Sequence, residues 1–134
     1  MEQELTAEAA ARVAEFRAAL RKFPRNGERV ARACGLTPQR YLLLLMIKGA
    51  PDGREQSTVT DLAERLQLAQ SSVTELVRRA EEAGLVEREA SVADARVAHL
   101  RLTPEGERRL ARSFTSLAAE REELRRAFAH LDAS

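Results

Sequence analysis

Aromatic residues and cysteine are scarce in this sequence: its 134 residues include no tryptophan, one tyrosine, four phenylalanines and one cysteine. A single cysteine excludes an intrachain disulfide framework, so a hydrophobic core has to stabilise the fold. Because 44% of the residues are nevertheless hydrophobic, we expect leucine, valine and alanine to build that core, a composition that favours helices. At this length, residues 1–134 are expected to form a single domain.

Long apolar segments are also absent. No stretch of the sequence approaches the roughly 20 apolar residues of a membrane-spanning helix. Residues 1–10 lack the basic start and the apolar segment of a secretory signal. We therefore expect a cytoplasmic protein without a membrane partner.

A strong excess of charge of either sign is missing too. The 22 Lys and Arg residues balance 21 Asp and Glu residues, which leaves a net charge of +1 at pH 7. Residues 57–102 contain six arginines and eight acids, a formal charge of −2. Long-range attraction to a polyanion is therefore weak, and any contact with phosphates has to come from locally placed arginines. The candidates are Arg78, Arg79, Arg88 and Arg96.

The central segment, residues 70–84, has the spacing of an amphipathic helix. Val73, Leu76, Val77 and Ala80 recur at i, i+3, i+4 and i+7, which predicts one buried stripe. Gly84 permits the left-handed conformation that ends helices. The opposite, exposed face then holds small hydroxyls followed by arginines, which are Ser71, Ser72, Thr74, Arg78 and Arg79.

A shorter helix is predicted just before this segment, over residues 60–66, with Thr60 as its N-cap and Asp61 in its first turn. Residues 67–69 leave room only for a turn. Two helices joined by so short a turn cross steeply, as in a helix-turn-helix whose second helix enters the DNA major groove.

Two strands are expected after the helix pair, over residues 85–88 and 97–102, with a polar loop over residues 89–96 between them. In the second strand Ala98, Leu100 and Leu102 alternate with polar residues. Helix-turn-helix and hairpin together form a winged helix.

Helices also flank this unit on the N-terminal side. Residues 6–22 are predicted to be helical with Thr6 as the cap, and residues 24–27, Pro-Arg-Asn-Gly, are expected to break that helix. One or two further helical turns follow at residues 28–33. Thr37 and Pro38 then open a helix, with residues 41–47 apolar on all sides and hence expected to be buried. Residues 51–53 should form a turn.

The C-terminal segment is predicted to be one helix from Thr103 and Pro104 to about Leu131. Its apolar residues follow a heptad-like spacing, with Arg121 in the one gap, and comprise Leu110, Phe114, Leu117, Leu124, Phe128 and Leu131. So narrow a seam favours pairing with other helices, and we expect the two terminal helices to contact each other and their symmetry mates in a homodimer. The alternative is that both pack only on their own domain.

These pieces occur together in a familiar order. The pattern L-x-x-S-S-V-T-x-L-V-x-R-x-E-x-x-G-L-V begins at Leu68, D-x-R stands at Asp94 and Arg96, and L-x-L-T-x-x-G ends at Gly106. The combination resembles the MarR family of bacterial transcriptional regulators. The resemblance implies a mainly helical fold with a small β-wing, a DNA-binding lobe at residues 37–102, and dimerisation helices at residues 1–36 and 103–134.

The resemblance also implies where DNA is bound. It places Arg96 in the minor groove, with Asp94 orienting it or bracing the wing, whereas without the family Asp94 is only a turn residue. On spacing alone, Arg78 and Arg79 equally fit a solvated helix face. The sequence departs from the commoner family pattern at Ala69, Gln70, Glu75 and Ala95. The expected DNA-binding residues are Gln70, Ser71, Ser72, Thr74, Arg78, Arg79, Asp94 and Arg96.

Small-molecule chemistry has fewer candidates. Relatives bind a small aromatic or anionic effector between the dimerisation helices and the lobe, where Tyr41 and Phe16 are either pocket residues or core. Cys34 is either a peroxide-sensing thiol or an idle one. His99 and His130 lack the spacing of metal ligands, and we expect no metal, no cofactor and no catalytic site.

We therefore predict a double-stranded DNA-binding transcriptional regulator, a ligand-responsive repressor that binds an inverted-repeat operator as a homodimer. A winged helix that binds another protein instead of DNA is the alternative, because the charge is nearly neutral. An enzyme is not expected.

Overall fold

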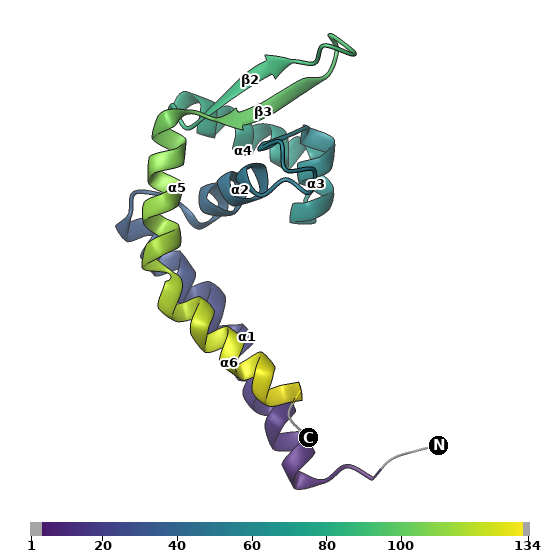
Figure 1. Cartoon of the computed structure of the whole chain (residues 1–134), viewed down its shortest axis with the longest axis vertical. Coiled ribbons are helices and arrows are strands. Elements are labelled where there is room, and N and C mark those ends of the chain that lie inside the picture. Colours follow the sequence, from purple (N-terminus) through teal and green to yellow (C-terminus); the bar gives the residue numbers. More distant parts are fainter. Residues whose placement is uncertain (1–3, 133–134) are drawn as a thin grey trace.

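The computed structural model describes residues 4–132 and has two parts, a lobe of short helices with a small sheet and a stalk of two long helices (Figure 1). The elements in chain order are α1 (Ala7–Ala33), α2 (Pro38–Lys48), β1 (Gln56–Ser57), α3 (Val59–Leu66), α4 (Gln70–Glu82), β2 (Val86–Ala90), β3 (Ala98–Leu102), α5 (Pro104–Ser116) and α6 (Ala118–Asp132). We call residues 38–102 the lobe and α1 together with α6 the stalk. This architecture confirms the predicted mainly helical fold with a small β-wing. Within residues 4–132 no helix combines the length and the apolarity needed to cross a membrane.

The sheet is antiparallel with the strand order β1-β3-β2. Val86 pairs with Leu102 at the base of the hairpin and Ala90 pairs with Ala98 near its tip. The hairpin therefore runs two residues beyond the predicted first strand, and the connecting loop is shorter than expected. Strand β1 was not predicted from the sequence; its two residues add to the other edge of β3 through Ser57 opposite Leu100.

The core of the lobe lies where α2, α3 and α4 meet β3. Leu43, Leu44, Leu62, Val73 and Leu100 are each 0% exposed there. Burying a side chain of this size contributes about 1.5–3 kcal/mol to folding. The aliphatic core expected from the composition is therefore present.

The expectation that residues 41–47 are buried on all sides is wrong, because Tyr41, Leu45 and Met46 are only partly buried and Leu42 is exposed. Leu42 is 44% exposed because it lies on the side of α2 that faces away from α3 and α4, while Leu43, Leu44 and Ile47 point into the core. Its exposed side chain lines a cavity described below.

Threonine caps begin four of the helices. Thr6, Thr37 and Thr103 accept a hydrogen bond from the backbone N–H three residues later, as predicted. The predicted cap of α3 was wrong, because Thr58 and not Thr60 accepts from the N–H of Asp61, at 3.1 Å. The helix therefore starts one residue earlier, and Thr60 lies in its first turn. A threonine cap of this kind contributes about 1 kcal/mol.

Helix α1 continues through Pro24, so the predicted break at residues 24–27 is wrong. A proline inside a helix removes one backbone hydrogen bond and costs about 3 kcal/mol. Packing against α6 offsets this cost along the length of the helix, for example where the Phe16 ring meets the edge of Phe128 at 5.8 Å between centroids. As expected, the terminal helices lie against each other (Figure 1).

The predicted single C-terminal helix is in fact two, α5 and α6, divided at Leu117. Leu117 is 4% exposed. The Arg121 guanidinium stabilises the break, because it donates to the Phe114 carbonyl at 2.7 Å and stacks 3.7 Å above the Phe114 ring. Leu110 and Leu117 are thus buried in the chain itself, while Phe114 and Phe128 remain exposed.

Candidate nucleic-acid interface

The orientation of α4 is fixed by its buried face. Val73, Val77 and Ala80 are each 0% exposed. Helix α3 packs against α4, and the turn between the two helices contains Gln67 in the left-handed conformation at φ 57°. Gly84 leaves the helix at φ 75°, as predicted. The exposed face of α4 is therefore held rigidly by the core of the lobe.

The exposed face of α4 has a defined centre. Successive residues of an α-helix are separated by about 100°, so Ser71, Glu75, Arg78 and Glu82 lie opposite Val73 and Val77. Ser72 and Arg79 flank this row on one side and Thr74 flanks it on the other. Ser71, Ser72, Thr74, Arg78 and Arg79 are all exposed.

The first turn of α4 has no side-chain cap, because Ala69 occupies the cap position. Gln70 turns toward α3, where its Nε2 donates to Oγ1 of Thr60 at 3.4 Å. The N–H groups of the first turn consequently remain without a side-chain acceptor, and such groups favour phosphate oxygens.

Glu75 links both arginines of α4. Its carboxylate accepts from Nε of Arg78 at 2.9 Å, from Nη2 of Arg78 at 2.5 Å and from Nε of Arg79 at 3.0 Å. These bonds, from Arg78 first and Arg79 second, lower the pKa of Glu75 to about 2. Arg78 also pairs with Glu82. Exposed pairs of this kind are weak, so both guanidinium groups can exchange a carboxylate for a phosphate.

The wing is braced around Asp94. The Asp94 Oδ1 atom accepts from the backbone N–H of Arg96 at 3.0 Å and from Nε of Arg96 at 3.2 Å. The backbone bond and then the guanidinium lower the pKa of the Asp94 carboxyl. Ser91 closes the turn by accepting from the N–H groups of Ala93 and Asp94. Asp94 thus fixes the backbone of Arg96, while the Arg96 side chain remains 89% exposed.

The eight residues predicted to bind DNA fall in two places. Six are on α4, and two are in the loop at the tip of the hairpin, whose strand β2 contacts α4 (Figure 1). From the sequence, Glu75 stood out only as a departure from the family pattern. Its spacing of three and four residues from Arg78 and Arg79 was the signal for the pairing that the structure shows.

Other reactive side chains do not assemble into a site. No group of three or more His, Cys, Asp and Glu residues able to hold a metal occurs between residues 4 and 132. Cys34 caps α1 and its Sγ lies 3.6 Å from Oγ of Ser116. His130 lies 3.4 Å from Glu15 on the stalk, far along the chain from His99 in the wing.

Residues 35–97, which span α2 to the wing loop, match the sequence profile of the MarR family. This match covers just under half of the chain, and over it the chain is similar to the MarR family. No curated protein sequence matches the chain. The profile covers the helix-turn-helix and the wing.

Solved structures of MarR-family and other transcriptional regulators share the fold. AbsC of Streptomyces coelicolor, a MarR-family regulator, is 23% identical with a TM-score of 0.69, over 96% of this chain and 83% of AbsC. A Thermotoga maritima transcriptional regulator is 27% identical with a TM-score of 0.64, over 81% of this chain and 73% of its own.

One such structure contains DNA. The M. tuberculosis transcriptional regulator MOSR, solved in complex with DNA, is 26% identical with a TM-score of 0.63, over 81% of this chain and 75% of MOSR. The chain therefore shares the fold of transcriptional regulators.

Proposed function

We propose that the protein is a homodimeric transcriptional regulator that binds an inverted-repeat operator in double-stranded DNA. The observation that supports this function best is the exposed row of hydroxyls and arginines on α4, together with an exposed Arg96 in the wing loop, on the fold of a regulator solved in complex with DNA. Helix α4 would lie in the major groove, with Ser71, Ser72 and Thr74 at base edges or phosphates. Arg78 and Arg79 then contact phosphate or guanine, and Arg96 enters the adjacent minor groove.

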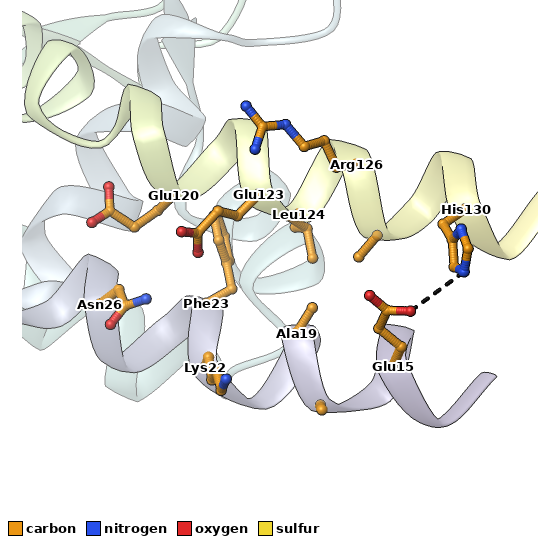
Figure 2. Close-up of a pocket in the computed structure, with 12 residues that line it drawn as sticks. Glu15, Ala19, Lys22, Phe23, Asn26, Glu120, Glu123, Leu124, Arg126 and His130 are labelled. Atoms are coloured by element: carbon orange, nitrogen blue, oxygen red, sulfur yellow. Dashed lines mark ion pairs between the residues drawn. The ribbon is translucent and has the colours of Figure 1, made fainter. Parts of the chain in front are cut away.

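The exposed apolar residues of the stalk support the homodimer. Val13 and Leu20, seven residues apart on α1, are 49% and 40% exposed, and Phe128 of α6 is 61% exposed. A groove of about 460 Å³ also runs between α1 and α6, where Phe23 and Leu124 lie among charged side chains such as Glu123 and Arg126 (Figure 2). A second copy of the stalk would cover these groups. Its two-fold axis would place the two α4 helices about 34 Å apart, one turn of DNA.

Selection of bound fragments from random duplex DNA tests this function. The expected result is a palindrome whose half-sites are centred about one helical turn apart, with an affinity that falls steeply as salt rises. Recovery of no enriched sequence at low salt would instead favour a winged helix that binds another protein. The formal charge of −2 over residues 57–102 makes this the second candidate.

The wing assignment predicts the effect of Arg96→Ala. Removing a guanidinium from a narrow minor groove should weaken operator binding about tenfold, while the melting temperature and the dimer stay unchanged because the side chain contacts only Asp94. Fluorescence anisotropy on the selected operator measures the change. Arg108→Ala serves as the control, because Arg108 is an exposed arginine on α5, outside α4 and the wing. Equal affinity of the Arg96 variant and the wild type would remove Arg96 from the interface.

We also propose that a small aromatic anion regulates the protein. An apolar cavity of about 290 Å³ lies between stalk and lobe, with Phe23, Tyr41 and Leu42 among its lining and Arg121 as its cation. Burial raises the pKa of the Tyr41 hydroxyl, against the opposing effect of the Arg121 guanidinium. Phe16, the other residue considered from the sequence, lies against Phe128 instead.

Benzoate is a suitable probe of this cavity. Millimolar benzoate should release the wild-type protein from its operator. A carboxylate bound by Arg121 between stalk and lobe would favour the arrangement of these two parts that binds the operator less tightly. Arg121→Ala should bind the operator but ignore benzoate, and Arg121→Lys should respond weakly. Anisotropy titrations at constant ionic strength measure this. Release of both variants as readily as the wild type would disprove the effector site.

A further inference from the structure

We propose that Glu75 is a base-specificity residue whose carboxylate accepts a hydrogen bond from the exocyclic amino group of a cytosine in each operator half-site. This inference rests on the proposed function, because it requires α4 to lie in the major groove. No other acidic residue lies in the N-terminal half of that helix, where side chains of a recognition helix contact base edges.

The position of Glu75 supports direct contact with bases. It lies one turn after Ser71 in the central row of the exposed face, and its side chain is 44% exposed although it pairs with two arginines. A shallow surface hollow of about 420 Å³ beside it is lined by Ser71, Ser72 and Arg79. A base edge that meets Ser71 therefore also comes within reach of Glu75.

The carboxylate retains capacity for one more donor. An ionised carboxylate has about four acceptor positions, two on each oxygen. Oε1 accepts from Nη2 of Arg78 and Nε of Arg79, whereas Oε2 accepts only from Nε of Arg78. One acceptor position thus remains on Oε2.

The chemistry of the bases identifies the donor. Glu75, with a pKa of about 2, is an anion at any pH used for binding and can only accept. Cytosine presents its N4 amino group to the major groove without an acceptor of its own, whereas the adenine amino group lies beside the N7 acceptor, and guanine and thymine present acceptors. A carboxylate therefore favours cytosine and opposes the other three bases.

The paired arginines strengthen this selectivity. Arg79 uses only its Nε–H on Glu75, so its four terminal N–H groups are free to contact a guanine or a phosphate next to the cytosine. When no cytosine is present, the carboxylate faces the acceptor groups of the other bases without a donor of its own. Glu75 thus lowers affinity for wrong sequences as well as raising it for the right one.

Glu75→Gln tests the inference, because glutamine keeps the size of the side chain but removes its charge and introduces an amide that pairs well with adenine. Wild type and variant are each taken through selection from random duplex DNA. We expect one cytosine in each half-site of the wild-type operator to lose its preference about tenfold in the variant, with adenine gaining. Binding to non-operator duplex should strengthen at the same time.

Glu82→Gln is the matched control. Glu82 also pairs with Arg78 on the same helix face, but it is the last residue of α4, away from the end that meets bases. Its variant should select the wild-type sequence. If Glu75→Gln also selects the wild-type sequence with unchanged preference, the inference is wrong while the proposed function stands. If the wild type selects no sequence at all, the proposed function itself fails. Circular dichroism confirms that both variants are folded.

Discussion

Replacing Val13 and Leu20 with glutamate should convert the protein to a monomer and weaken operator binding at least about hundredfold. The two residues lie two turns apart on α1 and remain 49% and 40% exposed in the single chain. Glutamates there would put four like charges into the interface of a symmetric dimer. In a dimer, binding of one subunit to its half-site raises the effective concentration of the other subunit at the second half-site. A monomer lacks this gain, which accounts for a loss of affinity of this size.

Sedimentation velocity and operator titration measure the two effects separately. Ala14→Glu is the control, because Ala14 is exposed on a different side of α1 and adds the same kind of charge. Both variants should keep the helical signal in circular dichroism. A Val13/Leu20 variant that remains dimeric and binds with wild-type affinity would place the interface elsewhere on the chain.

Gly106→Ala should lower the free energy of unfolding by about 3 kcal/mol, at the upper end of the range for overpacking. A Cβ atom on Gly106 would lie 2.1 Å from the Leu85 carbonyl oxygen, a backbone atom that cannot move alone. The same carbonyl accepts from the N–H of Thr103, and Oγ1 of Thr103 donates to the Gly84 carbonyl at 2.6 Å. The added methyl group therefore separates the start of α5 from the base of the wing.

Gly27→Ala is the matched comparison for this variant, and its expected change in the free energy of unfolding has the opposite sign. Gly27 lies inside α1, and the nearest atom to an added Cβ would be Cδ2 of Leu117 at an ordinary 3.8 Å. Alanine should then stabilise the protein by about 0.5 kcal/mol through its helix propensity. Urea unfolding at one fixed protein concentration compares the two. Equal stability of Gly106→Ala and wild type would contradict the close approach of α5 to Leu85.

Elements specified by local pattern were predicted well from the sequence. The stripe from Val73 to Ala80 and the left-handed Gly84 set α4, and the Thr-Pro pairs set the starts of α2 and α5. Each of these signals depends on residues within one or two turns of each other. The same locality explains the near miss at Thr58, since Thr60 two residues later fits the cap pattern almost equally well.

Features set by distant contacts were missed. Strand β1 is two residues long and exists because Ser57 pairs with Leu100. Pro24 is tolerated because α1 packs on α6, and the break at Leu117 follows from its burial and from the bond between Arg121 and Phe114. The weak helix formers Thr115 and Ser116 precede Leu117, but the heptad-like spacing across residues 110–131 favoured one continuous helix. Tertiary packing overrides propensity at each of these positions.

For the candidate interface, residue types were predictable and their pairing was not. The spacing placed Ser71 and Arg79 on the exposed face of α4, and the family resemblance implied that Asp94 orients Arg96 or braces the wing. Neither revealed that Glu75 accepts from both arginines of the helix, or that Asp94 accepts from the backbone N–H of Arg96. Side-chain geometry of this kind depends on rotamers that sequence spacing leaves open.

The neutralised arginines of α4 also affect how a protein of this kind would search a chromosome. Regulators bind random DNA mainly through cationic side chains that displace counterions from the phosphates. In this protein Arg78 and Arg79 already pair with carboxylates of their own helix. Residence on arbitrary sequence should be brief, so that the molecule hops more than it slides. The protein would then be found mainly at DNA sites that either displace those carboxylates from the arginines or donate a hydrogen bond to them.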